Sequence, residues 1–101
     1  RATMVLDVYN YRIKKYIGAY AAAMGGCDIL VWTGGVGENQ WATRRVVCEN
    51  MEYMGMKIDV EKNEGMRGEE MVISTPDSKV TIIVVPTDEE YMICRYNGYI
   101  R

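Results

Sequence analysis

Residues 29 to 39 constrain this chain more than any other stretch, because a short apolar run there ends abruptly in a glycine cluster. The run Ile29-Leu30-Val31-Trp32 has no polar alternation, which is typical of a strand buried on both faces, as in parallel sheets. The glycines that follow from Gly34 let the backbone turn sharply and let a ligand approach bare N–H groups. A helix predicted to start at about Gln40 would direct its positive end at that turn. The stretch predicts a site for phosphate or a nucleotide, with a tight ligand-free turn as the alternative.

Composition and charge exclude several classes of protein. The chain has 101 residues, of which 49% are hydrophobic and 26% charged, which is ordinary for one globular domain or a piece of one. A net charge of -2 provides no basic surface, so nucleic acid is not an expected partner. No apolar run has the length of a membrane span and no segment resembles a signal peptide, so we expect a cytoplasmic protein without a membrane partner. Because the chain starts at Arg1 without an initiator methionine, we also expect it to be part of a longer protein.

The cysteines and the lack of histidine limit the chemistry. Cys27, Cys48 and Cys94 are odd in number and widely spaced, so neither a disulfide framework nor a zinc site is expected. Each is interpreted as a small buried apolar residue. Without histidine, these residues cannot house Ser–His or Cys–His catalysis.

The N-terminal residues predict a long helix. Thr3 is a suitable N-cap, the helix is expected to run to about Met24, and Gly25-Gly26 would stop it. Apolar residues at three- and four-residue steps form one stripe, which we expect to pack in the core, tyrosines included. The residues of this stripe are Val5, Val8, Tyr9, Ile13, Tyr16, Ile17, Tyr20 and Met24.

A second helix is predicted directly after the glycines. Asn39 is expected to cap it, and it would run from Gln40 to Met54 and end at Gly55. Arg44 lies one turn into this helix. Its side chain would either reach the charge of a bound ligand or be a solvated surface arginine.

The second half of the chain predicts two strands and completes a layered arrangement. Asp59 is expected to cap a short polar turn that extends to Asn63. Segments 71–74 and 80–85 are predicted strands, joined by the turn 75–78. The order of helix, buried strand, helix, short strand, hairpin and helix predicts an α/β fold.

An acidic cluster follows the second of these strands. Thr87 is expected to open a last helix in which Glu90 completes a capping box. Asp88 and Glu89 would then lie in the first turn, where the helix dipole favours acids. They also follow the end of a buried strand, at the edge where ligands collect in open α/β sheets. A carboxylate there could hold hydrated magnesium beside nucleotide phosphates, and both interpretations stay open.

The glycine segment matches neither of the two common phosphate-binding motifs. The third glycine of a dinucleotide fingerprint would fall on Gln40, and no Gly-Lys-Ser/Thr sequence exists. What remains is Gly34-Gly35-Val36-Gly37-Glu38-Asn39. Preceded by Val31-Trp32-Thr33, this sequence resembles the acetate kinase family. Segments 7–23, 75–80 and 85–90 resemble it in matching order and spacing, so the likeness covers nearly the whole chain but only about the final quarter of such an enzyme.

The resemblance implies a fold of the acetate and sugar kinase/Hsp70/actin type. Residues 1–101 would be the C-terminal part of its second, nucleotide-binding domain, a ribonuclease H-like fragment without an internal boundary. Members transfer phosphoryl between ATP and acetate, giving acetyl phosphate and ADP, use Mg²⁺, and are expected to be homodimers. A propionate or butyrate kinase, or a non-catalytic nucleotide-binding or interaction module of the same fold, are the alternatives.

The resemblance also implies roles for particular residues. Glu89 would be the magnesium-associated carboxylate. The arginines, histidine and aspartate that act in the family's chemistry lie upstream, so no catalytic residue is assigned and we expect the isolated chain to be inactive. The residues that would line the adenosine and phosphate pocket are Gly35, Val36, Gly37, Glu38 and Asn39.

Overall fold

The computed structural model describes residues 2–86, 92–96 and 99–100. The helices are α1 (Ala2–Met24), α2 (Gly34–Asn39), α3 (Trp41–Cys48) and α4 (Val60–Asn63), with one 3-10 helix, η1 (Glu52–Met54). The strands are β1 (Ile29–Trp32), β2 (Met71–Val72), β3 (Thr81–Val84), β4 (Met92–Tyr96) and β5 (Tyr99–Ile100). None of the helices in the described ranges, including the 23-residue α1, is apolar enough over its length to cross a membrane.

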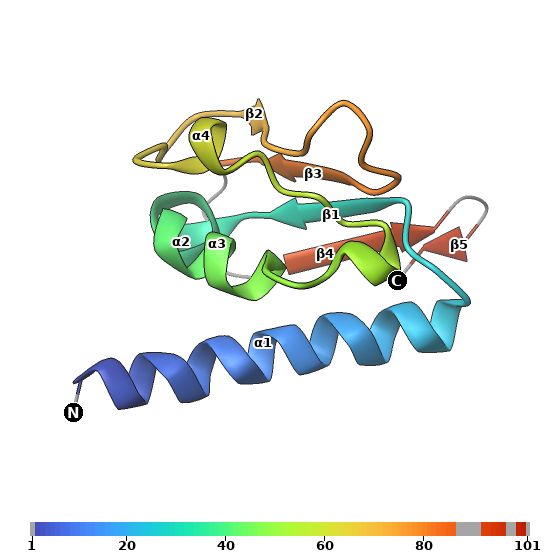
Figure 1. Ribbon diagram of the computed structural model, residues 1–101, viewed down its shortest axis with the longest axis horizontal. Helices are drawn as coiled ribbons and strands as arrows, with labels where there is room; N and C mark the ends of the chain where they lie inside the picture. The colour runs from blue at the N-terminus through green and yellow to red at the C-terminus, as the bar shows by residue number, and fades with distance from the viewer. Residues whose placement is uncertain (1, 87–91, 97–98, 101) are drawn as a thin grey trace.

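A five-stranded mixed sheet in the order β2-β3-β1-β4-β5 forms the centre of the molecule (Figure 1). β1 pairs in parallel with β3, with Leu30 opposite Ile82, and antiparallel with β4 on its other side. Leu30 and Trp32 in β1 and Ile82 and Val84 in β3 are buried. The residues that alternate with them are half-buried or exposed. The strand predicted from the apolar run 29–32 is confirmed, but the expectation that both its faces are buried is wrong, because the helices cover only one of them.

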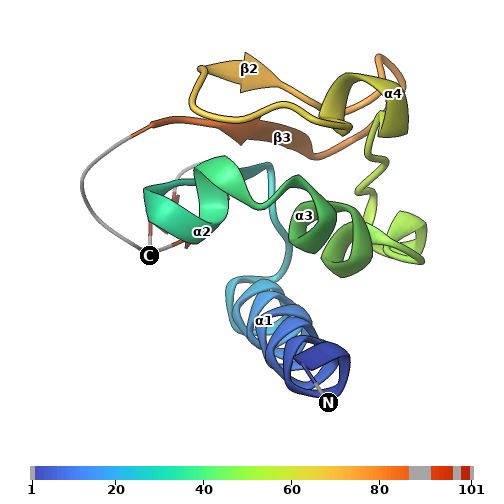
Figure 2. The same ribbon diagram turned by 90° about the vertical axis from the view of Figure 1, so that its left-hand side faces the viewer.

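The hydrophobic core lies between this covered face and the helices. α1 and α3 contact each other, and Figure 2 shows α3 between α1 and the strands. The loops on either side of the strands add methionine and isoleucine side chains. The buried residues of the core are Ile17, Met24, Leu30, Trp32, Val47, Cys48, Met51, Met56, Met66, Ile73, Val80, Ile82 and Val84.

Helix α1 buries a narrower stripe than its apolar pattern predicts. Ile17 and Met24 are buried as expected, and Gly25, with φ +81°, ends the helix. Tyr9, Tyr16 and Tyr20 are instead 42%, 56% and 49% exposed. The prediction that the tyrosines pack in the core is therefore wrong. α1 runs beside β4, and its N-terminal part extends beyond the strands (Figure 1). The apolar side of α1 is therefore wider than the surface that packs against it.

The predicted helix from Gln40 to Met54 is divided. α3 ends at Cys48, Asn50 adopts φ 60°, and the separate turn η1 follows. Asn39 is not its cap: it ends α2, and Gln40 precedes α3 without a side-chain cap bond. The glycine segment itself is helical, because α2 begins at Gly34. Gly55, with φ 87°, ends η1 as a left-handed cap, so only the predicted stop is confirmed.

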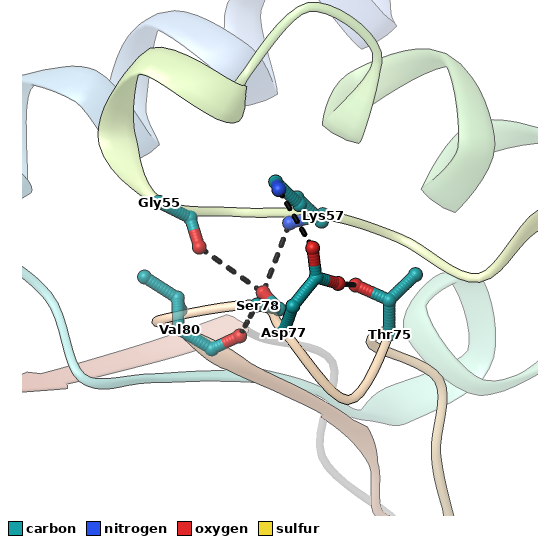
Figure 3. A network of polar contacts seen from close by, with 6 residues as sticks. All are labelled: Gly55, Lys57, Thr75, Asp77, Ser78 and Val80. Carbon is teal, nitrogen blue, oxygen red and sulfur yellow. Dashed lines mark hydrogen bonds and ion pairs between the residues drawn. The ribbon is translucent and has the colours of Figure 1, made fainter.

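The loops of the second half follow their local signals. Asp59 caps α4 as predicted, its Oδ1 accepting from the Lys62 backbone N–H at 3.1 Å. The turn 75–78 before β3 carries a polar network (Figure 3). The Ser78 hydroxyl accepts from the Lys57 N–H at 3.0 Å and donates to the Val80 carbonyl at 2.6 Å, with the Gly55 carbonyl at 3.0 Å as the second acceptor within reach. Ser78 thus ties η1, the following segment and β3 together.

The C-terminal residues form strands where a helix was predicted. Thr87 and Glu90 lie outside the described residues, but Met92–Tyr96 is strand β4, paired along β1, so a helix continuing through them is wrong. β4 pairs with β5, and Asn97-Gly98 stands between them in the sequence. Asn-Gly between two apolar runs is the strongest short-range hairpin signal, and it could have predicted this pair.

Candidate functional site

The glycine segment lies at the carboxyl end of the central strand. α2 begins at Gly34, whose φ of 79° favours glycine, and only Thr33 separates it from the end of β1. The Val85 N–H donates to the Trp32 carbonyl at 2.8 Å, so the chain leaving β3 stays beside the end of β1. The segment that leads to Thr87–Glu90 therefore leaves the sheet at the same edge as the glycines. Ligands in open α/β sheets bind at this edge.

Gly37 has a packing role that the sequence interpretation missed. A Cβ built on it would lie 3.1 Å from the Trp32 carbonyl carbon and 3.4 Å from the Trp32 Cα. α2 therefore sits directly on the backbone that ends β1. At this position glycine is required by the close approach of two backbone segments, and no ligand is needed to explain it.

Arg44 is neither a ligand-reaching side chain nor a solvated surface arginine, so both interpretations from the sequence are wrong. It is fully buried and donates three hydrogen bonds: Nε to Asn63 Oδ1 at 2.7 Å, Nη1 to the Gly37 carbonyl at 2.8 Å, and Nη2 to the Met66 carbonyl at 2.6 Å. Burial lowers the pKa of Arg44 to about 10, and the nearby Cys48 opposes this more weakly. The guanidinium remains charged at neutral pH.

A signal for this burial was present in the sequence. Arg44 stands three residues before Val47, four before Cys48 and seven before Met51. All three of these residues are buried, so Arg44 falls on the apolar stripe of the helix predicted over residues 40–54. A polar residue on an apolar stripe has to find buried partners. Asn63, also fully buried, is the first of them, and its Nδ2 donates in turn to the Trp41 carbonyl at 2.8 Å.

The segment after α4 lies next to the end of α2. Asn39 is exposed, and a Cβ built on Gly68 would lie 3.9 Å from the Asn39 Oδ1. The hydrogen bond from Arg44 to the Met66 carbonyl holds the same segment in place. The C-terminal end of the glycine segment is therefore bordered by residues that are distant in sequence.

The cysteines differ from one another. Cys48 is free and buried as expected, and burial raises the pKa of its thiol to about 12. The Trp32 indole and the charges of Lys14 and Arg44 oppose that rise more weakly, although the buried Trp32 Nε1 lacks the geometry of a regular hydrogen bond. Cys27 is disulfide-bonded, so the interpretation of Cys27 as a plain apolar residue is wrong.

The predicted site residues are only partly covered by the structure. The backbone of Gly35, Val36, Gly37, Glu38 and Asn39 forms α2. Glu89, the carboxylate that the resemblance assigns to magnesium, lies outside the described residues. Among the residues that are described, no group of three acidic, cysteine or histidine side chains could hold a metal ion.

The order of the glycine segment, α1 and the closing strand is that of a known protein family. The sequence model of the acetokinase family matches residues 1–95. The chain belongs to the acetokinase family. The resemblance inferred from the glycine segment is thus confirmed, and so is a mixed α/β arrangement of sheet and helices.

Relatives and solved structures within this family are similar over most of the chain. It is 95% identical over 93 residues to the acetate kinase of Parabacteroides distasonis, which is 92% of this chain and 23% of that protein. The crystal structure of Porphyromonas gingivalis acetate kinase superposes with a TM-score of 0.86 at 69% identity, over 87% of this chain and 22% of the other. The crystal structure of a propionate kinase from Francisella tularensis superposes with a TM-score of 0.72 at 30% identity, over 88% of this chain and 22% of the other. The chain therefore spans less than a quarter of the length of these kinases.

Proposed function

We propose that the whole protein transfers a phosphoryl group between ATP and acetate, forming acetyl phosphate and ADP. The observation that carries this is the 95% identity to an acetate kinase over 93 residues. A propionate or butyrate kinase is the alternative, but the solved propionate kinase is 30% identical to this chain, whereas the P. gingivalis acetate kinase is 69% identical. Acetate is therefore the favoured acyl substrate.

Residues 1–101 form, in this proposal, the C-terminal part of the second, ribonuclease H-like domain, which binds the nucleotide. The segment Gly35–Asn39 lines the adenosine and phosphate pocket. Its position at the carboxyl end of β1, beside the end of the parallel strand β3, supports this assignment. Phosphoryl transfer depends mainly on positioning and charge neutralisation, which a main-chain segment of this kind can supply.

Glu89 is proposed as the carboxylate associated with Mg²⁺. Magnesium commonly takes one or two carboxylates together with phosphate oxygens, and the chain approaches Thr87 from the same sheet edge as the glycine segment. The isolated chain is proposed to be inactive, because the family's arginines, histidine and aspartate lie outside it. The whole protein is proposed to be a cytoplasmic homodimer.

Steady-state kinetics of the full-length protein test the proposal. We expect Asn39→Ala to raise the KM for ATP, and Glu89→Ala to lower kcat about 10- to 100-fold and raise the Mg²⁺ requirement. Glu61→Ala, an exposed acid on α4, is the matched control and should change neither. Wild-type kinetics in both site variants would refute the assignment of this segment to the nucleotide site.

A non-catalytic nucleotide-binding or interaction module is the remaining alternative. Full-length protein without turnover of ATP and acetate would favour it over a kinase. A titration of that protein with ATP and magnesium, followed by the fluorescence of Trp32 and Trp41, then separates the two kinds of module. A change in emission favours nucleotide binding, and its absence favours an interaction role.

A further inference from the structure

We propose that Arg44 is a positioning residue for the nucleotide site, acting by fixing α2 and thereby the main-chain groups of Gly35–Asn39. The inference rests on the proposed function of that segment. Arg44 itself does not touch the nucleotide, because its side chain is fully buried. Its effect passes through the Gly37 carbonyl.

α2 needs an anchor because it is too short to hold its own shape. It has six residues, and the last four carbonyls of a helix have no partner within it. Helices of this length are not stable by themselves. The Arg44 guanidinium donates to one of these carbonyls, that of Gly37, at 2.8 Å. A cation at a helix C-terminus both satisfies the carbonyl and complements the helix dipole.

The guanidinium is itself held in place. Its Nε and Nη2 donate to Asn63 Oδ1 and the Met66 carbonyl, and Asn63 is fixed by its own bond to the Trp41 carbonyl. Through the Arg44 guanidinium, the Gly37 carbonyl is thus linked to α3, α4 and the segment after α4. A lysine cannot reproduce this, because three bonds in fixed directions need the planar guanidinium fork.

A second contact at Gly37 fixes α2 as well. Gly37 packs on the Trp32 backbone, with its virtual Cβ 3.1 Å from the carbonyl carbon. α2 is therefore held at Gly37 both by the end of β1 and by Arg44. Loss of the Arg44 contact removes one of these two supports, so the main-chain groups of Gly35–Asn39 are less well placed and bind the nucleotide less tightly.

The test uses the full-length protein with Arg44→Lys and Arg44→Met, and Arg45→Met as the matched control. Arg45 is the next residue, and its side chain is 39% exposed. Among the described residues it forms an ion pair with Glu49 alone. We expect Arg44→Lys to raise the KM for ATP about 3- to 10-fold and Arg44→Met more than about 10-fold, with the KM for acetate within about twofold of wild type. Arg45→Met should leave both constants unchanged.

The split between the two KM values separates positioning from a purely structural role. A purely structural Arg44 would lower the melting temperature and kcat and leave the ratio of the two KM values as in wild type, and that result overturns the inference. If Arg44→Met does not fold, Arg44→Lys decides alone, and an unchanged KM for ATP overturns the inference. Asn39→Ala tests the proposed function separately. If it raises the KM for ATP while Arg44→Lys does not, only the positioning role fails; if neither does, the proposed nucleotide site fails.

Discussion

Gly37 lies against the backbone of Trp32, close enough that a Cβ on the glycine would be 3.1 Å from the tryptophan carbonyl carbon. This contact joins α2 directly to the end of the central strand. Neither partner can move aside easily, because one is strand backbone and the other is held by Arg44. The glycine segment is thus placed by packing at Gly37 and by backbone conformation at Gly34.

Gly37→Ala should therefore destabilise the protein. Overpacking costs about 1–3 kcal/mol, and alanine returns up to about 1 kcal/mol through its higher helix propensity, so we expect a net loss of about 1 kcal/mol in the free energy of unfolding. Urea unfolding measures it. Gly18→Ala is the control, because a Cβ at Gly18 in α1 meets nothing within 4 Å, and it should stabilise by about 0.5–1 kcal/mol. A Gly37→Ala protein as stable as Gly18→Ala would contradict the close approach.

The buried and exposed sides of α1 predict losses of stability of different size at neighbouring positions. Ile17 is fully buried and Tyr16 is 56% exposed, with its ring stacked on Tyr20 at a centroid distance of 6.4 Å. Ile17→Ala should cost about 2–5 kcal/mol, whereas Tyr16→Ala should cost about 0.5 kcal/mol or less. Equal losses in urea unfolding would mean that the tyrosine side of α1 is packed after all.

Features governed by local chemistry were predictable from the sequence. The apolar run of β1, the glycine stop of α1, the Asp59 cap and the turn 75–78 all have their signals within a few residues. The family and its glycine segment were also predictable, because the order of its motifs is a property of the chain alone.

Features that depend on distant partners were not predicted, although the place of Arg44 on an apolar stripe and the sequence Asn97-Gly98 are local signals for two of them. Whether Tyr16 or Ile17 is buried depends on how much of α1 its neighbours cover. The burial of Arg44 depends on acceptors at residues 37, 63 and 66 that only the fold brings together. β4 is a strand because β1 offers it an edge, and the apolar pattern of 92–96 does not by itself exclude a helix.

Cys48 should be inert to alkylation in the folded protein. The thiolate is the reacting form, and burial raises the pKa of this thiol to about 12 and removes access to it. We expect iodoacetamide at about pH 8 to leave Cys48 unmodified in the native state and to modify it in guanidinium chloride, with peptide mass spectrometry to locate the label. Rapid labelling of Cys48 without denaturant would show that the α3–β1 contact opens readily.

The last prediction concerns acid stability at the turn before β3. The Lys57 Nζ lies 2.8 Å from Asp77 Oδ2, and the Thr75 hydroxyl donates to Asp77 Oδ1 at 2.7 Å (Figure 3). The hydrogen bond from Lys57, followed by that from Thr75, lowers the pKa of Asp77 from 3.8 to about 2. Because the folded pKa is below the unfolded one, this carboxylate stabilises the fold above about pH 4 and loses that contribution as the pH falls toward 2.

Asp77→Asn should therefore flatten the dependence of the urea midpoint on pH between about 4 and 2. The effect should be small and should shrink further in high salt, because both partners are exposed and salt screens such pairs. Glu61→Gln, an exposed acid on α4 outside this network, is the control and should keep the wild-type profile in this window. If Asp77→Asn and wild type fall in parallel from pH 4 to 2, the ion pair and the threonine bond do not hold Asp77 ionised, and the turn is fixed by its backbone hydrogen bonds and those of the Ser78 hydroxyl.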